Sequence, residues 1–185
     1  MAIKGGRIGR FIQIKFLRPL RLRAVINILE KLPLGKILDI GCMDDFLEKR
    51  LSRKFDYLGI DEEPFCENNK IIRKSVKDLK KGEKYDIVIA TEVLEHLDDP
   101  VDAIRTLKSL TKRYILISVP YEPFFSIFRM FLPAKEHLWT IFPQTLKKHL
   151  GKPVCERLAC FNRTYIALWD LKRNKPISYN GDKKR

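Results

Sequence analysis

The feature that most constrains this chain is a short apolar segment that runs into an acidic residue and a glycine. Residues 36–42 read Lys-Ile-Leu-Asp-Ile-Gly-Cys, and a second apolar segment ends in Asp61, twenty residues beyond Gly41. In α/β proteins such a strand-to-helix turn offers free backbone N–H groups, and the later acid accepts hydrogen bonds from both ribose hydroxyls. The pattern predicts a parallel sheet that holds a nucleoside at this turn.

The composition favours a single folded domain. The chain has 185 residues, of which 45% are hydrophobic and 10% aromatic, which is enough for a buried core. The four cysteines show no CxxC spacing, so reduced thiols in the cytoplasm are expected rather than a metal cluster or a disulfide framework. No apolar run approaches the roughly 20 residues that span a bilayer, and no signal peptide is recognisable.

Hydrophobic periodicity predicts alternating strands and helices. Expected strands are residues 36–40, 55–60, 71–73, 85–90, 114–119, 154–161 and 164–171, and expected helices are residues 20–32, 44–54, 101–110 and 142–150. Continuously apolar strands are typical of a parallel sheet with helices on both faces. The last two strands are expected to form a tight antiparallel hairpin around Asn162-Arg163.

The formal net charge of +14 is concentrated at the two ends. Residues 1–24 contain seven Lys or Arg and no acid, and residues 172–185 contain six and a single acid. We expect a basic segment over 1–18, one domain over 19–171, and a basic, disordered tail. The N-terminal segment suits an anionic membrane surface, which would make the protein peripheral there. It suits an RNA backbone equally well, and a merely solvated terminus is as plausible.

Four motifs in order resemble the class I S-adenosylmethionine-dependent methyltransferases. They are ILDIGC from Ile37, LGID from Leu58, YDIVIATEVLEHLDDPVDAIRTL from Tyr85 and ILISVPYEP from Ile115. The resemblance covers about residues 33–120. It implies an α/β fold: a seven-stranded, mostly parallel Rossmann-like sheet with helices on both faces and an antiparallel last strand.

The resemblance also implies S-adenosylmethionine as the cofactor. Asp39 and Gly41 would lie under its methionine part, and Asp61 would bind its ribose. The adenine contact would come from about residues 75–78, and Thr91 would border the sulfonium. The cofactor-binding residues predicted in this way are Asp39, Ile40, Gly41, Cys42, Met43, Asp61, Glu62, Val76, Asp78, Thr91 and Glu92.

Two residues depart from the glycine-rich turn of that family. Met43 and Asp45 stand where the turn would continue with glycine, and glycine there lets the backbone approach the cofactor closely. The side chain of Met43 therefore predicts a displaced or weakly bound cofactor. Asp44 and Asp45 place negative charge at the start of a predicted helix, which stabilises the helix by about 0.3–1 kcal/mol.

The segment after the fourth strand supplies the candidate catalytic side chains. Glu92, Glu95 and His96 are spaced i, i+3 and i+4, so in a helix they would share one face. Together with His137 they resemble the divalent-metal set of small-RNA 2′-O-methyltransferases and a related set in ubiquinone-pathway O-methyltransferases. Without a metal, His96 or His137 is the best candidate general base.

The prediction for function is a methyltransferase that moves a methyl group from S-adenosylmethionine to an oxygen or nitrogen of a small or lipid-like acceptor. Aromatic residues concentrated between Tyr121 and Phe142 predict a hydrophobic acceptor pocket or a membrane-facing lid. One alternative is an RNA-directed 2′-O-methyltransferase that uses a divalent metal. Another is a catalytically silent scaffold of the same fold that binds a partner or nucleic acid.

Overall fold

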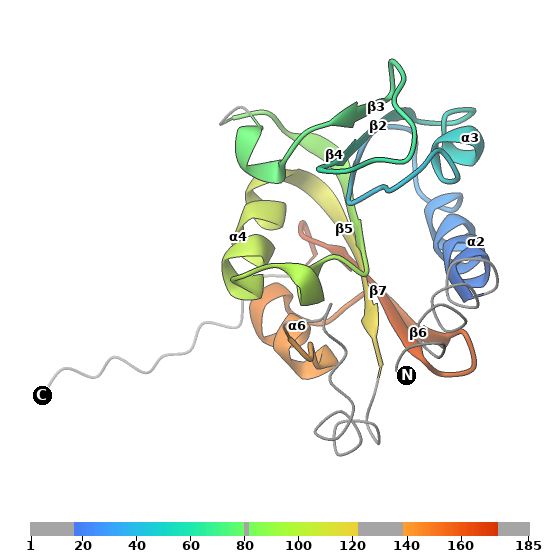
Figure 1. The fold of residues 1–185 in the computed structure, drawn as a ribbon. Helices are drawn as coiled ribbons and strands as arrows, with labels where there is room; N and C mark the ends of the chain where they lie inside the picture. Colours follow the sequence, from blue (N-terminus) through green and yellow to red (C-terminus); the bar gives the residue numbers. More distant parts are fainter. Residues whose placement is uncertain (1–16, 80–81, 122–138, 174–185) are drawn as a thin grey trace, which may run out of the picture.

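The computed structural model describes residues 17–79, 82–121 and 139–173, which build one sheet covered by helices (Figure 1). The strands are β1 (Lys36–Ile40), β2 (Asp56–Asp61), β3 (Ile71–Arg73), β4 (Tyr85–Thr91), β5 (Thr111–Pro120), β6 (Cys155–Ala159) and β7 (Thr164–Asp170). The α-helices are α2 (Arg18–Leu29), α3 (Glu48–Leu51), α4 (Pro100–Leu110) and α6 (Pro143–Leu150), and the 3-10 helices are η2 (Val76–Asp78) and η3 (Leu94–His96).

The seven strands lie in the order β3-β2-β1-β4-β5-β7-β6. Strand β7 is antiparallel to both of its neighbours, so β6 runs parallel to the other five strands. The predicted sheet, with its reversed last strand, is confirmed. The chain proceeds outward from β1 to β3 and then returns to β4 beside β1, so a topological switch point lies between β1 and β4. In open α/β sheets ligands bind at the carboxyl ends of the strands at such a point.

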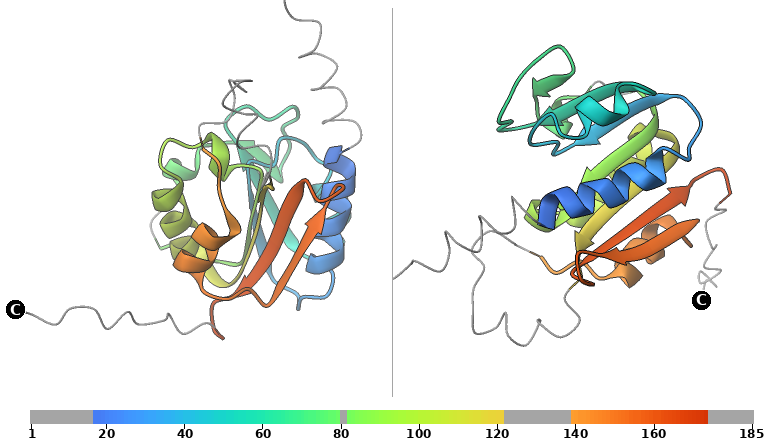
Figure 2. Two further views of the ribbon diagram at one scale, coloured as in Figure 1. Left: turned by 90° about the horizontal axis from the view of Figure 1, so that it is seen from below. Right: turned by 90° about the vertical axis from the view of Figure 1, so that its right-hand side faces the viewer.

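Helices cover both faces of the sheet (Figure 2), and each face has its own apolar core. Helix α2 packs Leu22 and Leu29 against one face, where Ile87 of β4 is also buried. Helices α4 and α6 cover the other face with Ile104 and Leu146. Burial of each large aliphatic side chain contributes about 1.5–3 kcal/mol to the stability of the fold. Both helical layers therefore stabilise the sheet, and the sheet fixes the positions of its strand ends.

The predicted helix over residues 44–54 is wrong in extent, because only the four residues of α3 are α-helical. The carboxylate of Asp44 accepts the Phe46 backbone N–H at 2.9 Å and also pairs with Arg18. Asp and Asn side chains that bond the nearby backbone in this way favour turns over helix interiors. The chain after β1 therefore begins with a turn, and its regular helix starts four residues later than predicted.

The predicted two-residue hairpin loop is also wrong, because residues 160–163 all lie between β6 and β7. Cys160, Phe161 and Asn162 adopt left-handed φ angles of 52°, 58° and 62°. The Arg163 N–H then donates to the Ala159 carbonyl at 3.1 Å. We call residues 160–163 the β6–β7 tip.

Most of the predicted end segments, 1–18 and 172–185, lies outside the described residues, as does most of the aromatic segment after Tyr121, including His137. Helix α2 begins at Arg18 and ends at Leu29, three residues before its predicted end. Within the parts of the chain that the structure describes, no helix has the length and apolar character to cross a membrane.

Candidate active site

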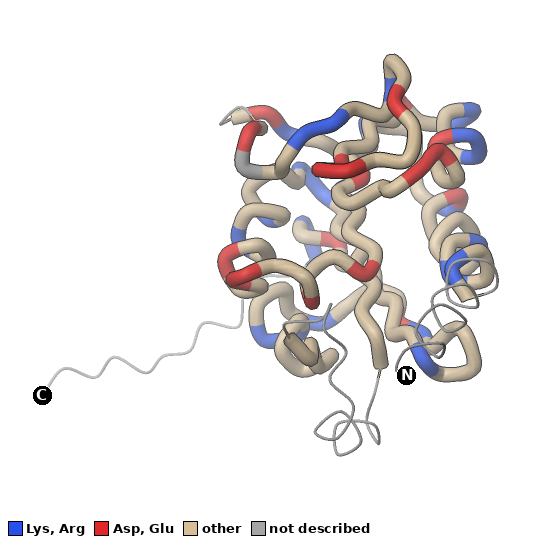
Figure 3. Tube along the Cα trace, in the orientation of Figure 1, with Lys and Arg blue, Asp and Glu red and all other residues tan. Residues whose placement is uncertain are grey.

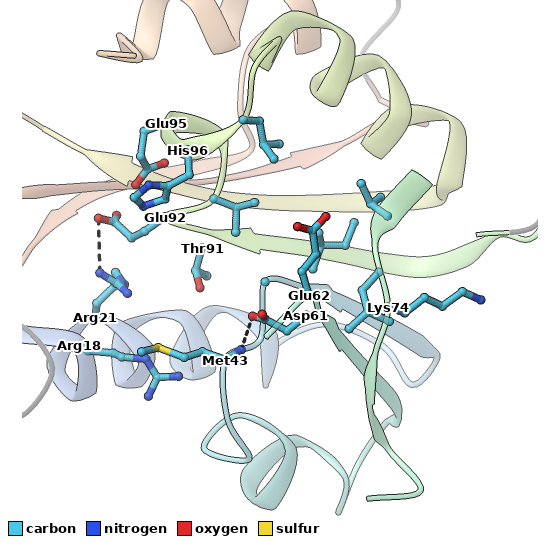
Figure 4. A pocket seen from close by; sticks show the side chains of 16 residues that line it. Arg18, Arg21, Met43, Asp61, Glu62, Lys74, Thr91, Glu92, Glu95 and His96 are labelled. Carbon is cyan, nitrogen blue, oxygen red and sulfur yellow. Dashed lines mark hydrogen bonds and ion pairs between the residues drawn. The ribbon is translucent and has the colours of Figure 1, made fainter. Parts of the chain in front are cut away.

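A cavity of about 410 Å³ opens at the carboxyl ends of β1, β2 and β4, at the switch point of the sheet. This volume lies within the range of small-molecule and cofactor sites. Its walls come from α2, the turns after these three strands, and η3 (Figure 4). The lining residues are Arg18, Arg21, Ile40, Gly41, Met43, Ile60, Asp61, Glu62, Lys74, Val76, Thr91, Glu92, Val93, Glu95, His96 and Leu97.

The turn after β1 bends through two left-handed residues. Gly41 has a φ of 71°, and a Cβ added there would lie 2.4 Å from Cγ2 of Val93, so both the backbone angle and the space require glycine. Met43 has a φ of 65°, which costs a residue with a Cβ about 1–2 kcal/mol. Met43 thus occupies a conformation suited to glycine, and its side chain extends along the cavity beside Arg18 in Figure 4.

The backbone N–H groups of residues 41–44 all have hydrogen-bond partners within the protein. The N–H groups of Gly41 and Cys42 donate to the Ile60 carbonyl at 2.8 and 3.2 Å, and that of Asp44 donates to the Cys42 carbonyl at 2.7 Å. The Met43 N–H donates to the Asp61 carboxylate. The expectation of free N–H groups at this turn is therefore wrong.

Asp61 stands at one end of the cavity with its carboxylate fixed. One oxygen accepts the Met43 N–H at 2.9 Å and the other accepts the Glu63 N–H at 2.8 Å. A carboxylate oxygen accepts more than one hydrogen bond, so each retains capacity for a ligand hydroxyl. The fixed orientation suits a vicinal diol, and Glu62, Lys74 and Val76 line the same end of the cavity.

The opposite end carries two arginines from α2 that the sequence reasoning missed as site residues. Arg18 forms two 2.8 Å hydrogen bonds with the Asp44 carboxylate and also donates to the Cys42 carbonyl. Arg21 is nearly buried and lies 3.4 Å from the Glu92 carboxylate. Their i, i+3 spacing places both arginines on one helix face and could have indicated a shared role. Residues 1–24 were instead interpreted as a basic end, so the two arginines were not considered for the site.

The segment after β4 is not α-helical, so the condition under which Glu92, Glu95 and His96 would share one helix face is not met. Glu92 has a left-handed φ of 56°, and only Leu94–His96 form a 3-10 turn. Glu92, Glu95 and His96 nevertheless all line the cavity. No group of three His, Cys, Asp or Glu side chains within the described residues is placed to hold a metal ion. The proposed fourth ligand, His137, lies outside those residues.

Eight of the eleven predicted cofactor-binding residues line the cavity, and Asp39, Cys42 and Asp78 do not. Asp39 is fully buried in β1, where burial raises the pKa of its carboxyl to about 7. Its Oδ2 accepts the Tyr57 hydroxyl at 2.6 Å, and its Oδ1 has no partner among the described residues. Burial likewise raises the pKa of the Cys42 thiol. Asp39 and Cys42 thus lie beneath the cavity and support the turn.

Comparison with known proteins identifies similar chains. Ubiquinone biosynthesis O-methyltransferase of Haemophilus ducreyi is 32% identical, with 56% of this chain and 52% of the relative covered. The enzyme of the same name from Acinetobacter baylyi is 30% identical, with 56% and 50% covered. The chain thus spans about half the length of the curated relatives it matches.

Solved structures share the fold. Magnesium protoporphyrin IX methyltransferase from Synechocystis PCC 6803, solved with bound SAH, has a TM-score of 0.67 and 18% identity over 88% of this chain and 86% of that one. The 1,6-didemethyltoxoflavin-N1-methyltransferase of Burkholderia thailandensis has a TM-score of 0.65 and 15% identity over 89% and 82%. The sequence model of the family described as "Methyltransferase domain" matches residues 10–152, most of the chain. The chain therefore belongs to the methyltransferase domain family.

Proposed function

We propose that this chain is an S-adenosylmethionine-dependent methyltransferase that methylates an oxygen or nitrogen atom of a small or lipid-like acceptor. The observation that carries the proposal is the cavity at the switch point, with a fixed carboxylate at one end and paired Arg and Glu side chains at the other. Family membership supports the activity. The names of the curated relatives favour an oxygen acceptor.

The residues at the ribose end fit the nucleoside part of S-adenosylmethionine. The doubly fixed carboxylate of Asp61 would accept both ribose hydroxyls. Val76 and Ile60 supply apolar walls near that end for the adenine ring. Figure 4 shows Asp61 beside Glu62 and Lys74, away from the two arginines.

The residues at the other end fit the amino-acid part. The guanidinium groups of Arg18 and Arg21 would hold the carboxylate, and Glu92 would attract the ammonium group. Over the whole lining, three Arg or Lys side chains face four carboxylates. S-Adenosylmethionine carries one net positive charge, because its amino acid is zwitterionic and its sulfonium is cationic. The charge of the cavity is therefore complementary to that of the cofactor.

When bound, S-adenosylmethionine would supply an electrophilic methyl group. The chain's own contribution is mainly positioning, which alone can lower a barrier by about 7–11 kcal/mol. Thr91 lines the middle of the cavity between its two polar ends. His96 and Glu95 line the cavity near Glu92 (Figure 4), and either side chain can accept the proton that an acceptor hydroxyl or amine releases.

The acceptor is proposed to be small or lipid-like because of the relatives' names and the character of this entrance. Trp139 donates its backbone N–H to the Glu95 carbonyl at 3.2 Å and is 48% exposed. A half-exposed aromatic residue that is bonded through its backbone to a cavity residue is compatible with an acceptor that has an apolar body.

Titration calorimetry with S-adenosylmethionine and S-adenosylhomocysteine tests the proposal. Wild type is expected to bind both, and Asp61→Asn is expected to weaken both by about tenfold to a hundredfold, because a charged acceptor of two hydrogen bonds is lost. Glu63→Gln is the matched control, since the Glu63 side chain is exposed and does not line the cavity.

Absence of binding at millimolar cofactor would instead support a catalytically silent scaffold. Equal losses in Asp61→Asn and Glu63→Gln would show that the cofactor does not use this end of the cavity. Once binding is established, transfer of a labelled methyl group to simple phenols and to lipid extracts would distinguish small from lipid-like acceptors.

A further inference from the structure

The β6–β7 tip displays a large aromatic side chain to solvent. Phe161 is 86% exposed, the highest exposure of any large hydrophobic residue in the described parts of the chain. The tip around it is fixed by backbone hydrogen bonds. The Arg163 N–H donates to the carbonyls of Ala159 and Cys160, and the Tyr121 N–H donates to the Arg163 carbonyl at 2.8 Å. Phe161 thus stands on an ordered turn.

The conformation of the tip is unfavourable for the residues it contains. Cys160, Phe161 and Asn162 are consecutive left-handed residues, and of these only Asn readily tolerates that region. A glycine or asparagine at position 161 would relieve the strain and remove exposed apolar surface. Strained positions that also display large apolar groups are candidates for binding surfaces.

The tip lies at the same edge of the sheet as the cavity. Strand β6 is parallel to β1 and β4, so its carboxyl end meets the edge where the cavity opens. The Cys160 thiol lies 3.2 Å from the Leu17 carbonyl, at the start of α2. The first turns of α2 carry Leu20, which is 43% exposed, and also Arg18 and Arg21 of the cavity.

The surroundings of the tip are basic. The first turns of α2 contain Arg18, Arg21 and Arg23 and no acid. Figure 3 shows basic and not acidic residues on these turns. Arg163 of the tip is exposed, and residues 157–169 contain no Asp or Glu.

We propose that the β6–β7 tip and Leu20 form a contact surface for an anionic lipid bilayer. Phe161 and Leu20 would enter the boundary between headgroups and acyl chains, and the basic residues would attract the anionic headgroups. An aliphatic side chain such as Leu20 gains more from this environment than from the stacking that single-stranded RNA offers aromatic residues. The surface would place the cavity entrance at the membrane. This consequence for the acceptor rests on the proposed methyltransferase function, whereas the contact itself does not.

Vesicle co-sedimentation of the full chain, without cofactor, tests the proposal. Wild type is expected to bind vesicles that mix phosphatidylcholine with phosphatidylglycerol more strongly than phosphatidylcholine alone, and to lose binding at high salt. Phe161→Asn keeps a residue that accepts the left-handed conformation, and it is expected to lower partitioning about tenfold. Leu34→Asn is the matched control, because Leu34 is 74% exposed but precedes β1 at the opposite edge of the sheet.

A second variant guards against a general effect on folding. Arg163→Gln is expected to weaken binding to the anionic vesicles and to leave the weak binding to phosphatidylcholine unchanged. Arg163→Gln should match wild type in thermal unfolding, and Phe161→Asn should be at least as stable as wild type because it relieves backbone strain. Both should match wild type in S-adenosylhomocysteine affinity, so a failure of this proposal is separable from a failure of the proposed function.

Three results would overturn the membrane assignment. They are equal partitioning of Phe161→Asn and Leu34→Asn, association that does not depend on anionic lipid, and a wild-type dimer that dissociates in Phe161→Asn without any lipid. The last result would assign the tip to a second copy of the chain. Phe161-dependent binding to an RNA oligonucleotide with no vesicle binding would likewise contradict the proposal.

Discussion

Among the described residues, every left-handed residue other than glycine lies at the carboxyl edge of the sheet. Met43 follows β1, Glu92 follows β4, and residues 160–162 follow β6. Such conformations cost free energy and persist where the surrounding structure holds them, often at binding sites. Two of these positions line the cavity and the others form the β6–β7 tip. The strain thus coincides with the two surfaces proposed to bind ligands.

Met43 combines backbone strain with an obstructing side chain, and two substitutions separate these effects. Met43→Gly removes both, so we expect the free energy of unfolding to rise by about 1 kcal/mol. Met43→Ala retains the left-handed strain and removes only the side chain from the cavity. Because the side chain extends along the cavity, both variants are expected to bind S-adenosylhomocysteine several-fold more tightly in titration calorimetry.

The stability and affinity measurements give independent answers. Unfolding in urea should distinguish the two variants, since only glycine relieves the backbone. Weaker binding by both variants would show that the Met43 side chain contacts the cofactor favourably. In that case the Met43 side chain would be part of the cofactor site and would not obstruct it.

Helix α2 connects the apolar layer of the sheet to the cavity. Its apolar side packs Leu22 and Leu29 into the core, while Arg18 reaches the turn after β1 and Arg21 reaches the end of β4. Both ion pairs join residues that are far apart in sequence. The helix therefore acts as a wall of the site, and its position depends on charge pairing as well as on burial.

The Arg18–Asp44 pair is the contact that a substitution can test most clearly. Arg18→Gln leaves the Asp44 carboxylate without its bidentate partner, and we expect a loss of about 1–3 kcal/mol in the free energy of unfolding. Arg23→Gln is the matched control, since Arg23 is an exposed arginine of the same helix. A double-mutant cycle with Asp44→Asn isolates the pair. A coupling energy near zero would contradict a role for the pair in docking α2.

The strands were predictable because each is a continuously apolar segment bounded by turn residues, and β1 and β3 have the predicted limits. The cavity residues on those strands and their turns could be predicted from the order of the sequence motifs along the chain. The roles of Arg18 and Arg21 could not be predicted, because they depend on ion pairs with Asp44 and Glu92, which lie 26 and 71 residues away in the sequence. The helix after β1 was overestimated since local side-chain hydrogen bonding at Asp44 outweighs helix periodicity there.

At the scale of the whole molecule, the sheet carries a buried carboxyl group at its centre. Asp39 lies on β1 between β2 and β4, and both neighbouring strands pair with it. Tyr57 donates to it at 2.6 Å, while Arg18, Asp61 and Asp44 act on it through their charges. Burial is the largest influence and raises its pKa from 3.8 to about 7. The ionised form of Asp39 is therefore unfavourable in the folded protein.

This burial predicts how stability depends on pH. Well below pH 4 Asp39 is protonated in both the folded and the unfolded chain, so it has no effect on the free energy of unfolding. Between pH 4 and 7 the folded chain retains the proton that the unfolded chain releases, and stability falls as pH rises. Above pH 7 the cost is complete, on the order of 4 kcal/mol for a shift of this size.

Asp39→Asn cannot ionise and is expected to remove this cost. In urea unfolding, the variant should resemble wild type near pH 4 and exceed it by several kcal/mol at pH 8. Tyr57→Phe removes the hydrogen bond that partly lowers the pKa of Asp39, so its decline in stability should extend to higher pH than in wild type. A difference between Asp39→Asn and wild type that stays constant from pH 4 to 8 would show that the group does not titrate in this window. The sheet would then hold an ionised carboxylate at its centre throughout, stabilised by Tyr57 and the charge of Arg18.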